Sequence, residues 1–255
     1  WGTYKIKNLL ECFYGYIPNP RFETFKKQFI TNKMLGSTIL NDKYFNKNLI
    51  NNKKFQVLLL EMGRGKTYAV IEYLIQQQKI CDENGVKLRV CWITNRISMA
   101  LNLMGRLNLG NDEKLDRQDD KGRNLNFVNY KDYDGNDLRK CEKVVIELES
   151  LFRIATTTNK NSGRVLRKGA EYDILIVDEI ESVFNSFSSD TTHQNGLTYD
   201  ANYLCFERLL KSSTQTFLMD AYIHKRTIKY IKILDIENKQ AKTKQGTLIG
   251  NGMKD

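Results

Sequence analysis

The most constraining feature of this sequence is a segment with two glycines and a lysine, between a strongly apolar run and a helical pattern. Residues 58–67 read Leu-Leu-Leu-Glu-Met-Gly-Arg-Gly-Lys-Thr. The apolar run 57–60 favours a buried parallel strand, and apolar residues continue with helical spacing over 68–80. Gly63 and Gly65 let the backbone turn with its N–H groups directed at an anion. The segment therefore predicts a phosphate-binding loop between a strand and a helix.

This loop carries the groups that a magnesium nucleotide needs. Lys66 is placed to reach the terminal phosphates, and the Thr67 hydroxyl opens the helix where it can ligate Mg²⁺. The helix N-terminus adds a partial positive charge. The full pattern G-x-x-x-x-G-K-[ST] would have glycine in place of Leu60, so a simple glycine turn between two packed elements is the alternative. The residues expected to contact the nucleotide are Met62, Gly63, Arg64, Gly65, Lys66, Thr67 and Tyr68.

A second apolar run ends in two adjacent acids. Residues 172–181 read Tyr-Asp-Ile-Leu-Ile-Val-Asp-Glu-Ile-Glu, which predicts a buried strand followed by Asp178 and Glu179. Because ligands of open α/β sheets bind at the carboxyl ends of strands, we expect Asp178 to contact Mg²⁺ through its water shell. Glu179 would be the general base, and Lys66 completes the catalytic set. The runs 144–149 and 217–220 also end in acids, and a solvated helix N-terminus is the alternative for the chosen pair.

Composition fits a polyanionic partner and argues against several other classes. Forty Lys and Arg residues against thirty Asp and Glu give a net charge of +10, which suits nucleic acid, although a basic surface without such a partner is an equal alternative. The five scattered cysteines lack paired spacing, so we expect neither disulfides nor a zinc site, and we expect a reducing compartment. No apolar run approaches the ~18 residues of a membrane span, so no membrane partner is expected.

Strand and helix patterns alternate from residue 54 onward, which predicts an α/β fold with a parallel sheet and helices on both faces. We expect residues 1–50 to be a lead-in segment, 51–235 a nucleotide-binding domain and 236–255 a linker or tail. Because the chain begins at Trp1, we also expect it to be a segment of something longer. A basic loop is expected around 164–168. The expected strands are 55–60, 88–94, 125–130, 144–148, 173–177 and 216–219, and the expected helices are 66–80, 98–107, a short one from 150, 180–187, 201–210 and 224–234.

The loops after two other predicted strands carry groups suited to phosphate oxygens. Thr94, Asn95 and Arg96 follow one strand, and Ser150 follows another. Hydroxyl, amide and guanidinium donors bind the phosphate backbone of nucleic acids, so we expect these four residues to contact DNA. A surface ion pair is the alternative for Arg96, and a helix N-cap is the alternative for Ser150.

Five short segments together resemble the motifs of one helicase family. The resemblance covers roughly residues 40–235 and is to the replication origin-binding helicases of superfamily 2, typified by the herpesvirus origin-binding proteins. The segments similar to its motifs I, Ia, Ib, II and III are Met62-Gly-Arg-Gly-Lys-Thr, Trp92-Ile-Thr-Asn-Arg-Ile-Ser, Ile146-Glu-Leu-Glu-Ser-Leu-Phe-Arg, Leu175-Ile-Val-Asp-Glu-Ile-Glu-Ser-Val and Leu218-Met-Asp-Ala-Tyr.

The resemblance implies a RecA-like P-loop NTPase domain that couples ATP to DNA unwinding or remodelling in replication, on single-stranded DNA or a duplex origin. The expected location is intracellular, in the nucleus or at a viral or cytoplasmic replication site. The resemblance places Asp220 at the joint between the nucleotide and DNA sites. Motors of this family hold ATP between two RecA-like domains, and the second supplies an arginine finger. The residues after Asp235 are too few for that domain, so we expect this chain alone to bind ATP with slow hydrolysis.

Two other functions fit parts of the sequence. A non-catalytic nucleic-acid-binding module would account for Leu60 and for Arg64, which stands where relatives of the family carry a small residue. A small-molecule P-loop kinase would need a lid with paired arginines, for which Arg164 and Arg167 are the only candidates.

Overall fold

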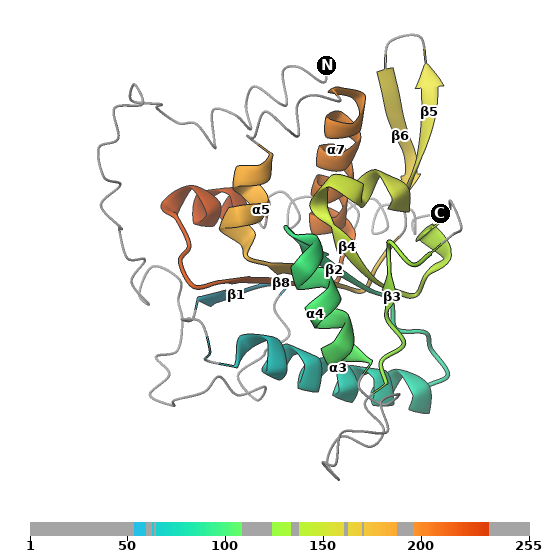
Figure 1. Ribbon diagram of the computed structural model, residues 1–255, viewed down its shortest axis with the longest axis vertical. Coiled ribbons are helices and arrows are strands. Elements are labelled where there is room, and N and C mark those ends of the chain that lie inside the picture. The colour runs from blue at the N-terminus through green and yellow to red at the C-terminus, as the bar shows by residue number, and fades with distance from the viewer. Residues whose placement is uncertain are drawn as a thin grey trace, which may run out of the picture. The chain divides into compact units, whose positions relative to one another are not determined.

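The alternating pattern folds into a layered α/β structure, seen in a computed structural model (Figure 1). Described residues up to Ala221 belong to one compact unit, and residues 222–234 belong to a second. The expected lead-in 1–50 and tail 236–255 lie outside the described residues. The structure describes residues 54–59, 63, 65–108, 124–133, 138–160, 163–169, 171–187 and 196–234.

A six-stranded sheet forms the centre of the first unit. Its strand order is β1-β8-β7-β2-β4-β3, and every neighbouring pair runs parallel. The predicted α/β class with a parallel sheet is therefore confirmed. One strand, β8, lies between the strand that precedes the glycine loop and the strand that ends in the acidic pair. The strands are β1 (Phe55–Leu59), β2 (Val90–Thr94), β3 (Val128–Asn129), β4 (Lys143–Glu147), β7 (Ile174–Asp178) and β8 (Gln215–Asp220).

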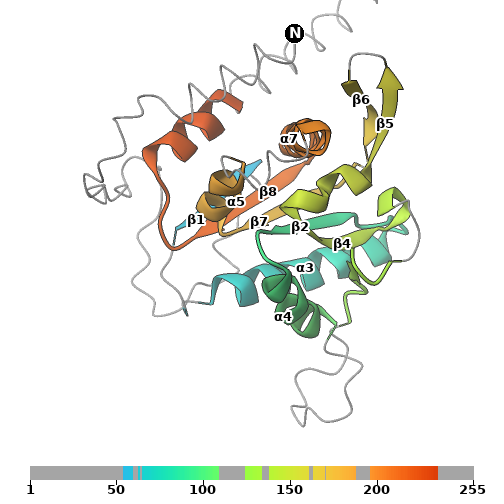
Figure 2. The ribbon, with the colours of Figure 1, turned by 45° about the horizontal axis from the view of Figure 1, so that its top comes forward.

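Helices cover both faces of this sheet (Figure 2). On one face lie α3 (Lys66–Glu83) and α4 (Ile97–Leu107), and on the other lie α5 (Ile180–Ser186) and α7 (Gly196–Ser212). All five residues of β2 are buried, as a strand covered on both faces requires. This explains why the strands read as continuous apolar runs rather than as alternating ones.

Aromatic contacts join the helices to the sheet and to each other. Tyr73 of α3 meets Phe217 of β8 edge to face, with ring centroids 5.4 Å apart. On the other face, Phe206 of α7 packs against Phe184 of α5 at 5.9 Å and against Phe187 at 5.4 Å. Such pairs add to the stabilisation from buried area, so α3 is fixed against the sheet, and α5 and α7 are fixed against each other.

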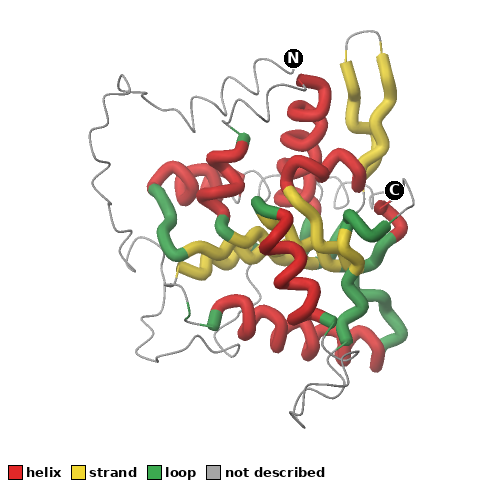
Figure 3. Tube along the Cα trace, viewed as in Figure 1, coloured by secondary structure: helices red, strands yellow, loops and turns green. Residues whose placement is uncertain are grey.

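Three local expectations were wrong. The basic loop expected around 164–168 is instead part of a two-stranded antiparallel ribbon, β5 (Ala155–Lys160) and β6 (Gly163–Gly169), shown in Figure 3. The sequence runs of threonine, valine and leucine favour strands more than a loop. The short helix expected from Ser150 is a 3₁₀ helix, η5 (Leu148–Ile154), that begins two residues earlier. The strand expected over 125–130 is reduced to the two residues of β3.

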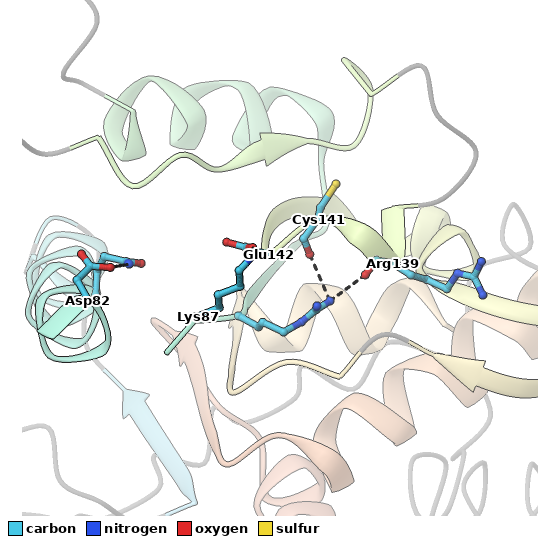
Figure 4. Close-up of polar contacts among 7 residues, drawn as sticks. Asp82, Lys87, Arg139, Cys141 and Glu142 are labelled. Atoms are coloured by element: carbon cyan, nitrogen blue, oxygen red, sulfur yellow. Dashed lines mark hydrogen bonds and ion pairs between the residues drawn. The ribbon is translucent and has the colours of Figure 1, made fainter. Parts of the chain in front are cut away.

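The amino edge of the sheet is held together by Arg89, the residue before β2. Its Nη2 donates to the carbonyl oxygens of Arg139 at 2.8 Å and Cys141 at 3.4 Å (Figure 4). Its Nε donates to the carbonyl oxygen of Glu171 at 2.7 Å, and its guanidinium lies 5.2 Å from the centroid of the Tyr172 ring. One side chain therefore joins the segments that lead into β4 and β7 to the start of β2.

The described part of the second unit is short. Residues 225–234 form a helix, close to the expected range of 224–234, and its first turn is closed by N–H groups of Thr227 and Ile228 that donate to the carbonyl oxygen of His224. Among the described helices, none combines the length and the apolar character that a membrane span requires.

Candidate functional site

The carboxyl ends of the parallel strands bring together residues that are far apart in the sequence. Asp220 ends β8 opposite Leu59, the last residue of β1, and Asp178 ends β7 opposite Met219. Thr94 ends β2, which runs parallel to β7. The glycine loop follows β1 and so leaves the sheet from this same edge. The candidate nucleotide residues therefore share one edge of the sheet.

The glycine loop leads into α3 through two left-handed backbone positions. Gly63 has φ +76° and Gly65 has φ +78°, a region in which side chains are strained. Gly65 is the N-cap of α3, and the Ala69 N–H donates to its carbonyl oxygen at 2.9 Å. Among the residues that the structure describes, none caps this helix with its side chain, and the first turn contains no acid. Its N-terminal N–H groups can therefore serve an anion. Leu60, Met62 and Arg64 lie outside the described residues.

Lys66, the first residue of α3, lies within electrostatic reach of three acids. Its ammonium is half-buried, and desolvation lowers its pKa, while Asp178, Asp220 and Glu179 act in the opposite direction. The two predicted halves of the nucleotide site therefore meet around one cation. Thr67 is half-buried in the same helical turn, whereas Tyr68 is 50% exposed.

Asp178 is a half-buried carboxyl group among other acids. Burial, first, and then the charges of Glu179 and Asp220 raise its pKa to about 6, against the lowering effects of Lys66 and of the Glu179 N–H, which donates to Asp178 Oδ1 at 3.1 Å. A desolvated carboxylate in a negative neighbourhood favours a cation, and the nearby donors are oxygens, which suit Mg²⁺. Among the described residues, no group of three or more His, Cys, Asp and Glu side chains surrounds a metal position. Mg²⁺ commonly takes one or two protein ligands together with phosphates and water.

Glu179 adopts a conformation that is unusual for a residue with a side chain. It is the N-cap of α5, with φ +52° and ψ +58°, in the left-handed region. Such a conformation costs roughly 1–2 kcal/mol in a residue other than glycine. This conformation turns the chain sharply between the end of β7 and the start of α5. The turn fixes the backbone of the proposed general base.

Asp220 links the end of β8 to the first turn of α5. Its Oδ1 accepts the Ala221 N–H at 2.7 Å, and its Oδ2 accepts the Glu181 N–H at 2.9 Å. Glu181 itself is 6% exposed. Hydrogen bonds to a carboxylate are among the stronger ones in proteins, so Asp220 is held firmly between the two elements.

The residues expected at the DNA site have different surroundings. Thr94 is fully buried, and its hydroxyl donates to the carbonyl oxygen of Arg96 at 3.4 Å. Asn95 has a buried Oδ1 that accepts no hydrogen bond from the part of the chain that the structure describes. Arg96 is exposed at the start of α4, which has no side-chain cap. Arg96 and the N-terminus of α4 are therefore accessible to a phosphate.

Ser150 belongs to a polar cluster whose other members the sequence did not single out. The Tyr130 hydroxyl donates to Glu147 Oε2 at 2.7 Å and also hydrogen-bonds Ser150. Arg153 lies over the Tyr130 ring and donates to the Tyr130 carbonyl oxygen at 2.7 Å. Burial, followed by Glu147, raises the pKa of Tyr130. Because the partners come from separate segments, no local motif indicated this cluster.

Comparison with known proteins places these residues in one family. Residues 41–252 match the family described as origin of replication binding protein. A protein of African swine fever virus (isolate Pig/Kenya/KEN-50/1950), provisionally named helicase/primase complex protein, is 31% identical over 171 residues, which are 67% of this chain and 13% of that protein. The replication origin-binding protein of human herpesvirus 6B (strain Z29) is 29% identical over 170 residues, 66% of this chain and 17% of that protein.

The chain thus spans less than a fifth of the length of these relatives. Among solved structures, a hypothetical ATP-dependent RNA helicase from Sulfolobus tokodaii is similar over 72% of this chain and 46% of that protein, with a TM-score of 0.45 and 16% identity. The family match covers most of the chain, including every strand of the parallel sheet. The chain belongs to the origin of replication binding protein family.

Proposed function

We propose that this chain is the ATP-binding half of a DNA motor that acts in replication. The observation that carries the proposal is the meeting of Lys66 with Asp178, Asp220 and Glu179 at the N-terminus of α3. A half-buried ammonium, an uncapped helix N-terminus and a cluster of carboxylates at one sheet edge suit a magnesium-bound triphosphate better than they suit a neutral ligand.

Each of these residues then has a separate task. The N–H groups after Gly65 hold the phosphates, and the Lys66 ammonium binds the terminal phosphate oxygens. Thr67 and Asp178 would hold Mg²⁺, which neutralises charge on the phosphate oxygens when bound. Glu179 orients the attacking water and accepts its proton.

The same edge of the sheet would carry DNA. Arg96 and the N-terminus of α4 would bind backbone phosphates. The other expected residues, Thr94, Asn95 and Ser150, lie at or just after the carboxyl ends of the neighbouring strands β2 and β4. Asp220 would couple the two sites through its hydrogen bonds to α5. The names of the relatives, origin-binding and helicase/primase, support a replication site as the place of action. The partner would be a second RecA-like domain, as the resemblance to the helicase family implies.

Mg-ATP affinity separates this proposal from the alternative of a non-catalytic nucleic-acid-binding module. Lys66→Ala should weaken Mg-ATP binding by about 10–100-fold, because a charge-assisted hydrogen bond contributes about 1.5–3 kcal/mol. Titration calorimetry or a fluorescent ATP analogue measures this change. The matched control is Lys79→Ala, an exposed lysine later in the same helix, which should bind Mg-ATP like the wild type.

Equal Mg-ATP affinity of the wild type and Lys66→Ala would contradict the proposal and favour the binding module. Turnover that DNA does not stimulate, in a longer chain that contains the second domain, would favour the small-molecule kinase instead.

A further inference from the structure

The β5–β6 ribbon extends from the sheet at the edge where the candidate site lies. The strands of the sheet are parallel, so β4 ends at the same edge as β2 and β7, and η5 continues from β4 directly into β5. Figures 1 and 3 show the ribbon extending away from the sheet beside α7. It is therefore an appendage to the edge that carries Arg96, and it belongs to no other layer of the fold.

The base of the ribbon is anchored by a buried amide. Asn202 of α7 is 2% exposed, its Oδ1 accepts the Phe152 N–H at 2.7 Å, and its Nδ2 donates to the Glu149 carbonyl oxygen at 2.8 Å. Both hydrogen bonds go to the backbone of η5. An isolated two-stranded ribbon is only marginally stable, so this anchor and the packing of α7 against β6 determine where the ribbon begins and which way it leaves.

The charged residues of the ribbon are all basic. From Ser150 to Ala170 the sequence contains no Asp or Glu but five basic residues. Arg153 is engaged at Tyr130, and the other four lie within the two strands. In the strand register Thr156 pairs with Lys168 and Thr157 with Leu166, so Arg167 is the extra residue of a bulge. The four basic strand residues are Lys160, Arg164, Arg167 and Lys168.

A ribbon with basic residues and no acidic ones suits a negatively charged partner. A basic two-stranded ribbon of about seven residues per strand can follow a polyanionic backbone, and hydroxyl and amide residues on the other strand add neutral donors for phosphate oxygens. The kinase alternative would require its arginines in a lid over the nucleotide, but here they lie within a strand of a ribbon anchored to η5 and α7.

We propose that the β5–β6 ribbon is a nucleic-acid contact that binds the sugar–phosphate backbone of DNA at the carboxyl edge of the sheet, the edge that also carries Arg96. This proposal rests on the proposed function, because it extends the DNA site at the same edge of the sheet. The ribbon binds DNA without sequence specificity, since phosphate contacts carry no sequence information.

The test is DNA binding by a variant with a neutral ribbon. Arg164→Gln, Arg167→Gln and Lys168→Gln together should weaken binding of a fluorescent single-stranded oligonucleotide at least about tenfold near 0.1 M salt. They should also reduce the slope of log affinity against log salt by about 2, because each lost phosphate contact on single strands contributes about 0.7. The same titration with duplex DNA shows which form the ribbon prefers.

The matched control removes the same charge from the opposite edge of the sheet. Three exposed lysines lie at the amino edge: Lys79, Lys87 and Lys140. The variant with all three changed to glutamine should bind DNA with an affinity within about threefold of the wild type and with the same salt slope. A second ribbon variant, Arg164→Lys with Arg167→Lys, keeps the charge and should also bind like the wild type.

Mg-ATP affinity, measured on the same samples, distinguishes the two proposals. DNA binding by the neutral-ribbon variant that equals the wild type, with an equal salt slope, would overturn the ribbon proposal and leave the proposed function standing. Equal losses in the ribbon and amino-edge variants would also overturn it, since only net charge would then matter. If the wild type bound Mg-ATP but no DNA, the ribbon proposal would fail together with the DNA part of the proposed function.

Discussion

At the scale of single residues, the candidate site is built at a cost to stability. Asp178 is a carboxylate in a desolvated position, and Glu179 is held in the left-handed region. Neither feature helps the chain to fold. Both are expected where a protein positions groups for a ligand rather than for its own core.

This cost predicts that Asp178→Asn stabilises the ligand-free chain. Folding raises the pKa of Asp178 from 3.8 to about 6, so between these values the folded state binds more protons than the unfolded state. Stability therefore falls as pH rises through this window, and the full penalty, at most about 3 kcal/mol, is present above it. Urea unfolding at pH 7.5 should show the variant to be more stable, and at pH 4 the difference should be small.

Asp132→Asn, at an exposed position, is the control and should change stability little at either pH. A variant of Asp178 that is less stable than the wild type at pH 7.5 would show that the carboxylate is favourable in the folded state, contrary to this prediction.

The residues of the candidate nucleotide site could be singled out in the sequence because their signal is local. Gly63, Gly65 and Lys66 occur within four positions, and Asp178 directly precedes Glu179, so adjacency and residue type sufficed to single them out. The Tyr130 and Glu147 pair could not be found in this way, since its hydrogen bond depends on how β3 is placed beside β4. Nor does the sequence indicate the positive φ of Glu179.

At the scale of elements, the amino edge depends on one side chain. Arg89→Ala should destabilise the chain by about 2–3 kcal/mol, because hydrogen bonds from a charged group to three carbonyl oxygens are lost. Arg89→Lys should recover only a small part of the lost stability, since a single ammonium cannot replace a planar guanidinium that donates to two segments. Thermal or urea unfolding measures both changes.

The neighbouring ion pair provides the comparison. Lys87 Nζ lies 2.6 Å from Glu142 Oε1, but the two side chains are 79% and 42% exposed (Figure 4). Lys87→Ala should therefore cost less than about 1 kcal/mol. If Lys87→Ala and Arg89→Ala had equal effects, the proposed role of Arg89 in joining the segments would be wrong.

Strands of the sheet were predictable, whereas the elements outside it were less so. Val144, Ile176 and Phe217 lie in apolar runs that a strand covered on both faces needs, and the predicted ranges of their three strands differ from the observed ones by one residue at each end. The ribbon was missed because its basic residues were interpreted as a loop signal. Strand pairing there depends on the partner segment across the turn, which no single-segment pattern contains.

At the scale of the whole molecule, the proposed function makes the chain one half of a motor. The sequence resemblance implies that a second RecA-like domain supplies an arginine finger, which contributes about 10³–10⁵ in rate in related phosphoryl transfers. We expect the 255-residue chain to bind Mg-ATP but to turn it over slowly, and a longer chain that includes the second domain to gain a large, DNA-stimulated rate. Phosphate release with and without single-stranded DNA measures the difference.

A Glu179→Gln variant of the longer chain is the control for contaminating ATPases, since it should keep Mg-ATP binding and lose the stimulated rate. Rapid DNA-stimulated turnover by the 255-residue chain alone would show that no second domain is needed.

The two backbone hydrogen bonds of Asp220 have a mechanical consequence. Because the carboxylate accepts a hydrogen bond from α5 with one oxygen and from the end of β8 with the other, it couples the positions of these two elements. A small displacement of α5, which directly follows the strained Glu179, would pull on the last residue of a strand that has β1 on one side and β7 on the other. Tension at a single carboxyl group would thus reach the two strands that lead into the glycine loop and into the acidic pair.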